Sequence, residues 1–250
     1  SCFFITHTFS KTSLTKPFIF FFLQETFSGF GYVVLGLGEM PTSAVTNFRS
    51  PNNQVQRRSR GEIPSDFLNS DTSALQFAKE IKLQEYAGFN ALLFDGENFV
   101  YCHNQKDKDD NYTPAINLPA GLYGLSNHLL NTPWPKVQRT KQALADTVKL
   151  TKNIDLTQHL LSALQNDEIA SDDLLPNSGV GLALERLLSP AFITSPSYGT
   201  RTSTVVIIEQ ESSTTHPSPN DKAQKIFFHE RQYQGDKNKF KECSYTICQP

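Results

Sequence analysis

The sequence lacks an excess of charge of either sign. Its 250 residues carry 23 Lys and Arg against 25 Asp and Glu, which gives a formal net charge of -2. Proteins that follow the phosphate backbone of a nucleic acid present a basic face, and the one basic cluster here, QRRSR at Gln56–Arg60, is typical of a solvated turn. We therefore expect no nucleic-acid partner.

Cysteine is also scarce. Four cysteines stand at positions 2, 102, 243 and 248, with no CxxC pair and no histidine at metal-ligand spacing. This pattern argues against a zinc site and against the dense disulfide framework of a small secreted protein. Cys243 and Cys248 are close enough in sequence to pair, but reduced thiols in a cytosolic protein are the simpler expectation, and no metal or other cofactor is predicted.

The sequence offers no long hydrophobic run. The apolar stretch PFIFFFL at Pro17–Leu23 is far shorter than the ~20 residues that span a bilayer, and no small-residue cleavage site follows it as in a secretory signal. We read it as a buried strand, and we expect a cytoplasmic protein without a transmembrane segment. No GxGxxG or P-loop pattern occurs, so a nucleotide site has no support.

Turn and capping residues divide the first half of the chain into strands and one helix. Val33–Leu37 and Ser43–Phe48 indicate short strands, and Asp95-Gly96 marks the turn of a hairpin. A helix is expected to follow a cap at Ser70 or Asp71.

The second half continues this mixture. An extended segment ends at Gly124–Asn127, after which Asn131 or Thr132 is expected to cap a helix that has Pro133 at its first position. Asp155 is expected to cap another helix.

The stretch around Arg201 raises a chemical question. Ser203–Glu209 is a β-branched apolar run typical of a strand covered on both faces, and Lys225–Tyr233 is expected to be its neighbour. A guanidinium at the mouth of a buried strand is costly to desolvate unless a partner accepts its hydrogen bonds. Helices set among hairpin-connected strands favour an α+β fold with mainly antiparallel sheets.

Several segments, in the same order, resemble the Asn-Arg-Asp-Glu (NRDE) family, also called the transport and Golgi organisation 2 family. They are Ser43–Pro51 (SAVTNFRSP), Arg58–Leu68 (RSRGEIPSDFL), Gly88–Gly96 (GFNALLFDG), Gly121–Val137 (GLYGLSNHLLNTPWPKV), Tyr198–Ile208 (YGTRTSTVVII) and His229–Tyr233 (HERQY). That family is similar to the N-terminal-nucleophile hydrolases and, more distantly, to choloylglycine and penicillin V hydrolases. The resemblance implies one domain over residues 1–250, folded as a four-layer αββα sandwich of two stacked, mainly antiparallel sheets.

The resemblance also implies a catalytic site. It places Cys2 as the nucleophile that attacks an amide carbonyl with its own α-amino group as base. It places Asn47 and Asn127 near the oxyanion and Arg201 beside the cysteine, where a guanidinium lowers a thiol pKa.

Each of these residues also has a simpler interpretation. Cys2 is a small apolar residue that suits an edge strand. Asn47 is suited to an Asx-turn, and Asn127 to capping or turning the chain before the next helix. Arg201 can bridge to a surface carboxylate.

Residues 1–42 depart from the family pattern and are shortened. Leu23–Thr26 (LQET) stands where the family has Asn, Arg, Asp and Glu, and a segment of about thirty residues, roughly a hairpin and its connections, is missing after it. Ser1 precedes Cys2, so the α-amine is available only if Ser1 is removed. Either the chain is a divergent member impaired in catalysis, or these residues come from an altered gene model.

Two functions follow from the resemblance, a third interpretation is an αββα domain that retains no activity, and the choice stays open at this stage. The first is hydrolysis of a small amide through Cys2. The second is non-enzymatic ligand handling or trafficking, with haem, lipid or acyl-CoA as the implied ligands and Golgi organisation as the implied process. The sequence names no axial residue for haem, and it gives neither the substrate nor the oligomeric state.

Overall fold

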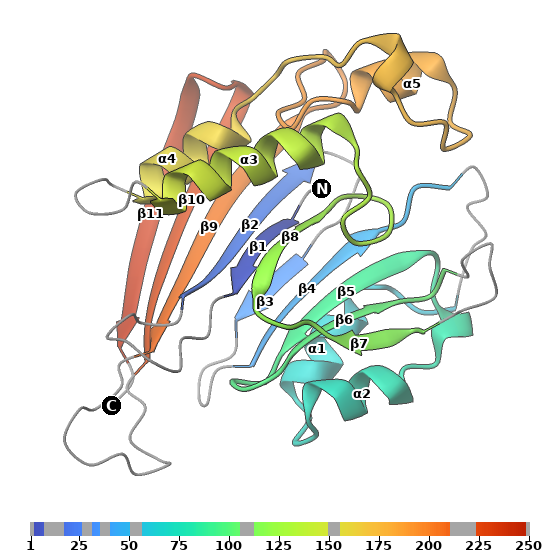
Figure 1. Cartoon of the computed structure of the whole chain (residues 1–250), viewed down its shortest axis with the longest axis vertical. Coiled ribbons are helices and arrows are strands. Elements are labelled where there is room, and N and C mark those ends of the chain that lie inside the picture. Colours follow the sequence, from blue (N-terminus) through green and yellow to red (C-terminus); the bar gives the residue numbers. More distant parts are fainter. Residues whose placement is uncertain are drawn as a thin grey trace.

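The chain folds into helices and two antiparallel sheets, an α+β arrangement (Figure 1). The computed structural model describes residues 3–7, 18–26, 32–35, 41–50, 57–105, 113–149, 156–210 and 224–248. Within these ranges no helix is long and apolar enough to cross a bilayer, and no group of three or more His, Cys, Asp or Glu side chains is placed to hold a metal ion.

The first sheet has six strands in the order β11-β10-β9-β2-β1-β8, and all described pairings are antiparallel. The bounds are β1 Phe3–His7, β2 Phe18–Thr26, β8 Gly121–Leu125, β9 Thr200–Gln210, β10 Gln224–Asp236 and β11 Lys239–Cys248. The phenylalanine run therefore lies in a strand, as predicted. The strand at Ser203–Glu209 and its neighbour are also confirmed, because β9 pairs with β10 along its length.

The second sheet has five antiparallel strands in the order β3-β4-β5-β6-β7. The bounds are β3 Tyr32–Leu35, β4 Thr42–Asn47, β5 Phe89–Phe94, β6 Phe99–His103 and β7 Ala115–Asn117. Every residue of β5 and β6 is buried. A strand buried on both faces needs a packed layer on each side of the sheet.

The helices are short except for one. The bounds are α1 Glu62–Leu68, α2 Ala74–Glu80, α3 Pro135–Lys149, α4 Leu156–Leu164 and α5 Leu182–Leu187, with 3₁₀ turns at Leu83–Glu85 and Asp172–Leu174. Figure 1 shows α3 and α4 beside the six-stranded sheet and α1 and α2 beside the other sheet.

Three hydrophobic clusters hold these elements together, and the alternation of side chains along each strand explains them. Between the sheets, Ala44 and Leu92 of the five-stranded sheet meet Val206 of β9 in one cluster. The preceding residue on β9, Val205, faces α3 and α4 in a second cluster. The next residue on β4, Val45, faces α1 and α2 in a third.

The structure corrects the predicted helix starts. The cap of α2 is Ser73, whose Oγ accepts a hydrogen bond from the Gln76 backbone N–H at 3.4 Å, and not Ser70 or Asp71. Helix α3 begins at Pro135, so this proline and not Pro133 occupies the first helical position. Asp155, the other predicted cap, lies outside the described residues.

Reduced thiols, the simpler expectation for Cys243 and Cys248, are confirmed, and the alternative that the two pair is excluded. Both thiols are free and lie five residues apart on the single strand β11. A strand rises about 3.4 Å per residue, so their Cα atoms are roughly 17 Å apart, far beyond the reach of a disulfide.

The hairpin turn at Asp95-Gly96 is confirmed between β5 and β6, with Gly96 at a φ of 96°. The Asp95 side chain serves two elements. Oδ1 accepts hydrogen bonds from the backbone N–H groups of Glu97 (3.0 Å) and Asn98 (2.7 Å), and Oδ2 accepts one from Ala74 at the start of α2 (2.8 Å).

We expect Asp95→Ala to lower the free energy of unfolding by about 1–3 kcal/mol, because three backbone donors lose a carboxylate acceptor. Urea denaturation followed by circular dichroism measures the change. Glu97→Ala in the same turn is the control, since its exposed side chain accepts none of these bonds, and it should shift stability by less than about 0.5 kcal/mol. Equal effects of the two variants would contradict this role of Asp95.

Candidate functional site

Four strand ends meet at one edge of the six-stranded sheet. The first described residue of β1, Phe3, pairs with Leu125 near the end of β8. The last residue of β2, Thr26, pairs with Thr200 at the start of β9. Strands β1 and β2 are antiparallel, with His7 opposite Ile19, so both pairs lie at the same edge. Topology thus brings the start of β9, with Arg201, to the edge where β1 begins and β8 ends.

Asn127 joins this edge to the end of β4 in the five-stranded sheet, and we call this contact the junction. Its Nδ2 donates hydrogen bonds to Thr46 Oγ1 at 3.1 Å and to the Asn47 carbonyl at 3.0 Å, and its own carbonyl accepts the Arg49 N–H at 2.7 Å. The structure therefore brings Asn47 and Asn127 together, although 80 residues separate them. Asn127 does not cap the following helix. Its carboxamide N–H groups are directed to the end of β4.

Asn47 forms no Asx-turn, which its simpler interpretation required. Among the described residues, nothing donates a hydrogen bond to its buried Oδ1. Buried polar atoms in folded proteins almost always have a partner, so this oxygen is an exception among the described residues.

An ion pair buried beside this junction links it to α5. Arg49 Nη1 lies 2.6 Å from Glu185 Oε2, and the two side chains are only 8% and 4% exposed. Glu185 Oε1 accepts the backbone N–H and the hydroxyl of Ser178 at 2.9 and 2.6 Å. The guanidinium also stacks over Trp134, 4.5 Å from the ring centroid. Arg49 lies in the NFRSP segment that carries the family resemblance, but no signal in the sequence pointed to its buried partner.

Aromatic packing holds the segment that follows Asn127. The His128 ring lies between Phe48, at 4.8 Å between centroids, and Trp134, at 5.6 Å. Its Nδ1 is 2.9 Å from Thr132 Oγ1. Trp134 is 7% exposed and belongs to the hydrophobic cluster that packs α3 and α4 against the six-stranded sheet. These contacts give His128 a structural place in the junction.

Arg201 lies in a bulge of β9. Glu25 of β2 pairs with Thr202 and the next residue, Thr26, pairs with Thr200, which leaves Arg201 as the extra residue on its strand. The residue is exposed. The predicted cost of desolvating a guanidinium therefore does not arise here, because a bulge redirects a side chain away from the regular strand face.

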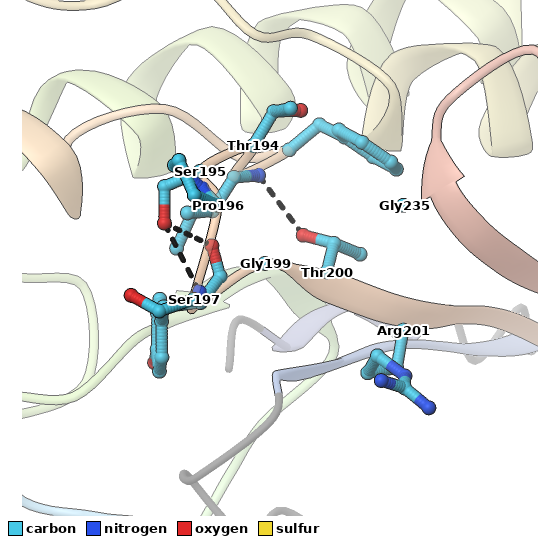
Figure 2. Close-up of a pocket in the computed structure, with 11 residues that line it drawn as sticks. Thr194, Ser195, Pro196, Ser197, Gly199, Thr200, Arg201 and Gly235 are labelled. Atoms are coloured by element: carbon cyan, nitrogen blue, oxygen red, sulfur yellow. Dashed lines mark hydrogen bonds between the residues drawn. The ribbon is translucent and has the colours of Figure 1, made fainter.

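A cavity of about 340 Å³ opens beside the start of β9. Its lining residues are Phe192–Arg201 together with Gly235. Figure 2 shows the Thr194–Ser197 loop on one side of Thr200, with Gly235 and Arg201 on the other side. A backbone hydrogen bond closes the base of the loop, since the Thr200 N–H donates to the Ile193 carbonyl at 2.8 Å.

Cys2, the predicted nucleophile, lies outside the described residues. Among the described thiols, Cys102 is buried, Cys243 is half-buried and Cys248 is exposed. Burial raises the pKa of Cys102 to about 12. Burial and then the negative charge of Glu230 raise the pKa of Cys243. Neither residue is an activated thiol.

Comparison with known proteins gives a consistent result. The family model described as Transport and Golgi organisation 2 matches residues 38–234. A human protein named Transport and Golgi organization protein 2 homolog is 32% identical over 187 residues, covering 69% of this chain and 66% of that protein. The bovine protein of the same name is 31% identical over 190 residues, covering 69% and 66%. The match spans just under two thirds of the length of these relatives.

We expect Glu185→Ala to lower the free energy of unfolding by about 3–5 kcal/mol, because it leaves the Arg49 guanidinium buried without its counter-charge. Thermal or urea unfolding measures this loss. Glu168→Ala is the matched control: Glu168 pairs with Arg139, but its side chain is 64% exposed, and such pairs contribute about 0–1 kcal/mol. A loss as small as that of the control would rule out a structural role for the buried pair.

Iodoacetamide at pH 8 should modify Cys248 well before Cys102. The thiolate is the reactive form, and a thiol with a pKa of about 12 is thiolate in roughly one molecule in ten thousand at pH 8. Peptide mass spectrometry over a time course gives the rates. Labelling in guanidinium chloride, where both thiols should react alike, is the control, and equal rates in the native protein would show that Cys102 is accessible.

Proposed function

Because the chain belongs to the transport and Golgi organisation 2 family, we propose that the edge where β1, β8 and β9 meet binds a small molecule and hydrolyses an amide bond through Cys2. Amide hydrolysis is the reaction in which Cys2, Asn47, Asn127 and Arg201 would act together. The family name of the relatives describes transport and Golgi organisation, and it specifies no reaction.

The order of the hydrophobic clusters supports the fold that this chemistry uses. One cluster joins α3 and α4 to the six-stranded sheet, one lies between the sheets, and one joins the five-stranded sheet to α1 and α2. A sequence of helix, sheet, sheet and helix layers is what a four-layer αββα sandwich of the N-terminal-nucleophile type requires.

The observation that carries the proposal is the register of β1. Phe3 pairs with Leu125, two residues before Asn127, and Asn127 is bonded to Asn47. Cys2 is the residue covalently joined to Phe3, and consecutive Cα atoms are about 3.8 Å apart. This covalent link to Phe3, at the edge on which the two asparagines converge, supports the proposal that the thiol acts there.

In the proposed reaction, the Cys2 thiol transfers its proton to its own α-amine and the sulfur attacks the amide carbonyl carbon. The protonated amine then passes that proton to the leaving nitrogen as the C–N bond breaks, leaving a thioester that water hydrolyses. The Nδ2 atom of Asn127 is already directed to Thr46 and Asn47. We therefore assign Asn127 to positioning Asn47, whose carboxamide stabilises the oxyanion.

A second function, ligand handling without turnover, is favoured by the sequence of β2. Its end, Leu23–Thr26, holds no arginine and no aspartate where the family tetrad has both. Gln24 there pairs with Ser203 of β9. Without that charged pair to orient a nucleophile, the same edge would retain a ligand without cleaving it, and haem, lipid and acyl-CoA are the ligand classes to try.

The deciding experiment compares two forms of the chain, one beginning at Cys2 and one retaining Ser1, with a panel of fluorogenic amides. Intact mass and N-terminal sequencing first establish which form each sample contains. Hydrolysis should require the form that begins at Cys2, and Cys2→Ala should abolish it. Asn47→Ala should lower kcat by about 10²–10³-fold, as for loss of an oxyanion donor.

Asn69→Ala is the matched control, because Asn69 lies at the exposed end of α1 and, among the described residues, its hydrogen bonds are to that helix. Background rates from every folded form would reject the hydrolase and leave ligand handling. Binding assays with haem and acyl-CoA then follow.

A further inference from the structure

We infer that Tyr101 and Asn90 are positioning residues of the candidate site: they tie the turn at residues 126–132 to the five-stranded sheet at a second point, and so hold the Asn127 carboxamide on the end of β4. This inference deepens the proposed function and rests on it only where a reaction rate is predicted. The hydrogen bonds that carry it join described residues and do not involve Cys2.

The second attachment of this turn is the Tyr101 hydroxyl. It donates a hydrogen bond to Asn90 Oδ1 at 2.7 Å and accepts one from the Leu130 backbone N–H at 3.2 Å. Tyr101 lies on β6 and Asn90 on β5, so both belong to the five-stranded sheet, whereas Leu130 follows Asn127 in the 126–132 turn. The turn therefore meets this sheet twice, through Asn127 at β4 and through Leu130 at β6.

Strand register places the two attachments on one face of the sheet. Thr46, which accepts a hydrogen bond from Asn127, pairs with Asn90 across β4 and β5, and both Thr46 and Asn90 are 0% exposed. Side chains alternate along a strand, and Leu92, two residues after Asn90, belongs with Tyr101 to the cluster between the sheets. The polar side chains of both attachments thus emerge toward the six-stranded sheet.

A buried hydroxyl suits this position because it donates and accepts at once. Burial raises the pKa of Tyr101 above its ordinary value, so the hydroxyl keeps its proton, and with it the bond to Asn90, across the neutral range. Because that proton goes to Asn90, the lone pairs of the oxygen are left to accept the Leu130 N–H. The Tyr101 ring is stacked on the His103 ring, with 5.2 Å between the centroids. Asn90 therefore acts through Tyr101, and Tyr101 acts on the turn.

Contacts within the turn connect Leu130 to Asn127. The Thr132 hydroxyl donates to the Leu129 carbonyl at 2.7 Å, and its oxygen lies 2.9 Å from Nδ1 of His128, the residue next to Asn127. With both attachments in place the turn is held on either side of these contacts. Losing the one at Leu130 is expected to leave the Asn127 carboxamide less fixed, because a single attachment permits tilting that two prevent.

The test uses the full chain with Tyr101→Phe, which removes the hydroxyl and keeps the ring. Proton–nitrogen NMR follows the side-chain NH₂ signals of Asn127, which are assigned by their absence from Asn127→Ala. In Tyr101→Phe these signals should shift and broaden, and the Leu130 amide should exchange with deuterium about 10-fold faster. Asn90→Ala should cause the same changes and add nothing to them in the Tyr101→Phe background, because the effect of Asn90 passes through the hydroxyl.

Tyr86→Phe is the matched control. Tyr86 is 4% exposed, as is Tyr101, but it packs in the cluster that faces α1 and α2, so its substitution should leave the Asn127 signals unchanged. Should Tyr101→Phe fail to fold, Asn90→Ala decides by the same two measurements. Unchanged Asn127 and Leu130 signals in the folded variant, or equal changes in Tyr86→Phe, would overturn the inference.

Kinetics supply a second readout in the form of the chain that begins at Cys2. There Tyr101→Phe should lower kcat by about 10–100-fold, as for a small displacement at the reacting centre, while KM stays within about twofold. A purely structural role would lower activity only in proportion to the folded fraction, which circular dichroism measures.

The two proposals can fail separately. If the Asn127 signals respond to Tyr101→Phe but the form beginning at Cys2 hydrolyses no amide, the positioning role stands and the hydrolase does not. If amides are hydrolysed and neither kcat nor the Asn127 signals respond to Tyr101→Phe, the hydrolase stands and this inference is wrong.

Discussion

The contact on which the candidate site depends is the pair of hydrogen bonds from Asn127 to the end of β4. One carboxamide, at the end of a strand in the six-stranded sheet, fixes Thr46 and the Asn47 carbonyl in the five-stranded sheet. The segment that carries Asn127 is itself packed, because the His128 ring contacts both Phe48 and Trp134.

Two arginine side chains near this junction differ in their burial. Arg49 is buried against Glu185 and Trp134, so its guanidinium is satisfied within the protein and stabilises the position of α5. Arg201 is exposed at a bulge. The same residue type is thus buried in one place and exposed in the other, and the two guanidinium groups differ in how much of their hydration they lose on folding.

Local signals predicted local structure well where one residue type dominates the geometry. The Asp95-Gly96 turn was found because glycine accepts a positive φ and aspartate accepts hydrogen bonds from the next backbone N–H groups. The start of α2 was harder to predict because Ser70, Asp71 and Ser73 are all good N-cap residues. In the structure Ser73 is the N-cap, and the Asp95 carboxylate accepts the first backbone N–H of α2 beside it. Pro133 and Pro135 presented the same ambiguity at α3.

By itself the sequence determined the antiparallel α+β character and the strands around β5, β6, β9 and β10, because the alternating and β-branched patterns that favour a strand extend over only a few neighbouring residues. The resemblance of ordered segments pointed to the family and to Asn47, Asn127 and Arg201. Only the tertiary structure decided that Asn127 bonds to Asn47 across 80 residues, that Arg49 pairs with Glu185 across 136, and that a bulge exposes Arg201. Such contacts depend on which strands become neighbours in space and on which polar groups become buried together. No local sequence pattern encodes either.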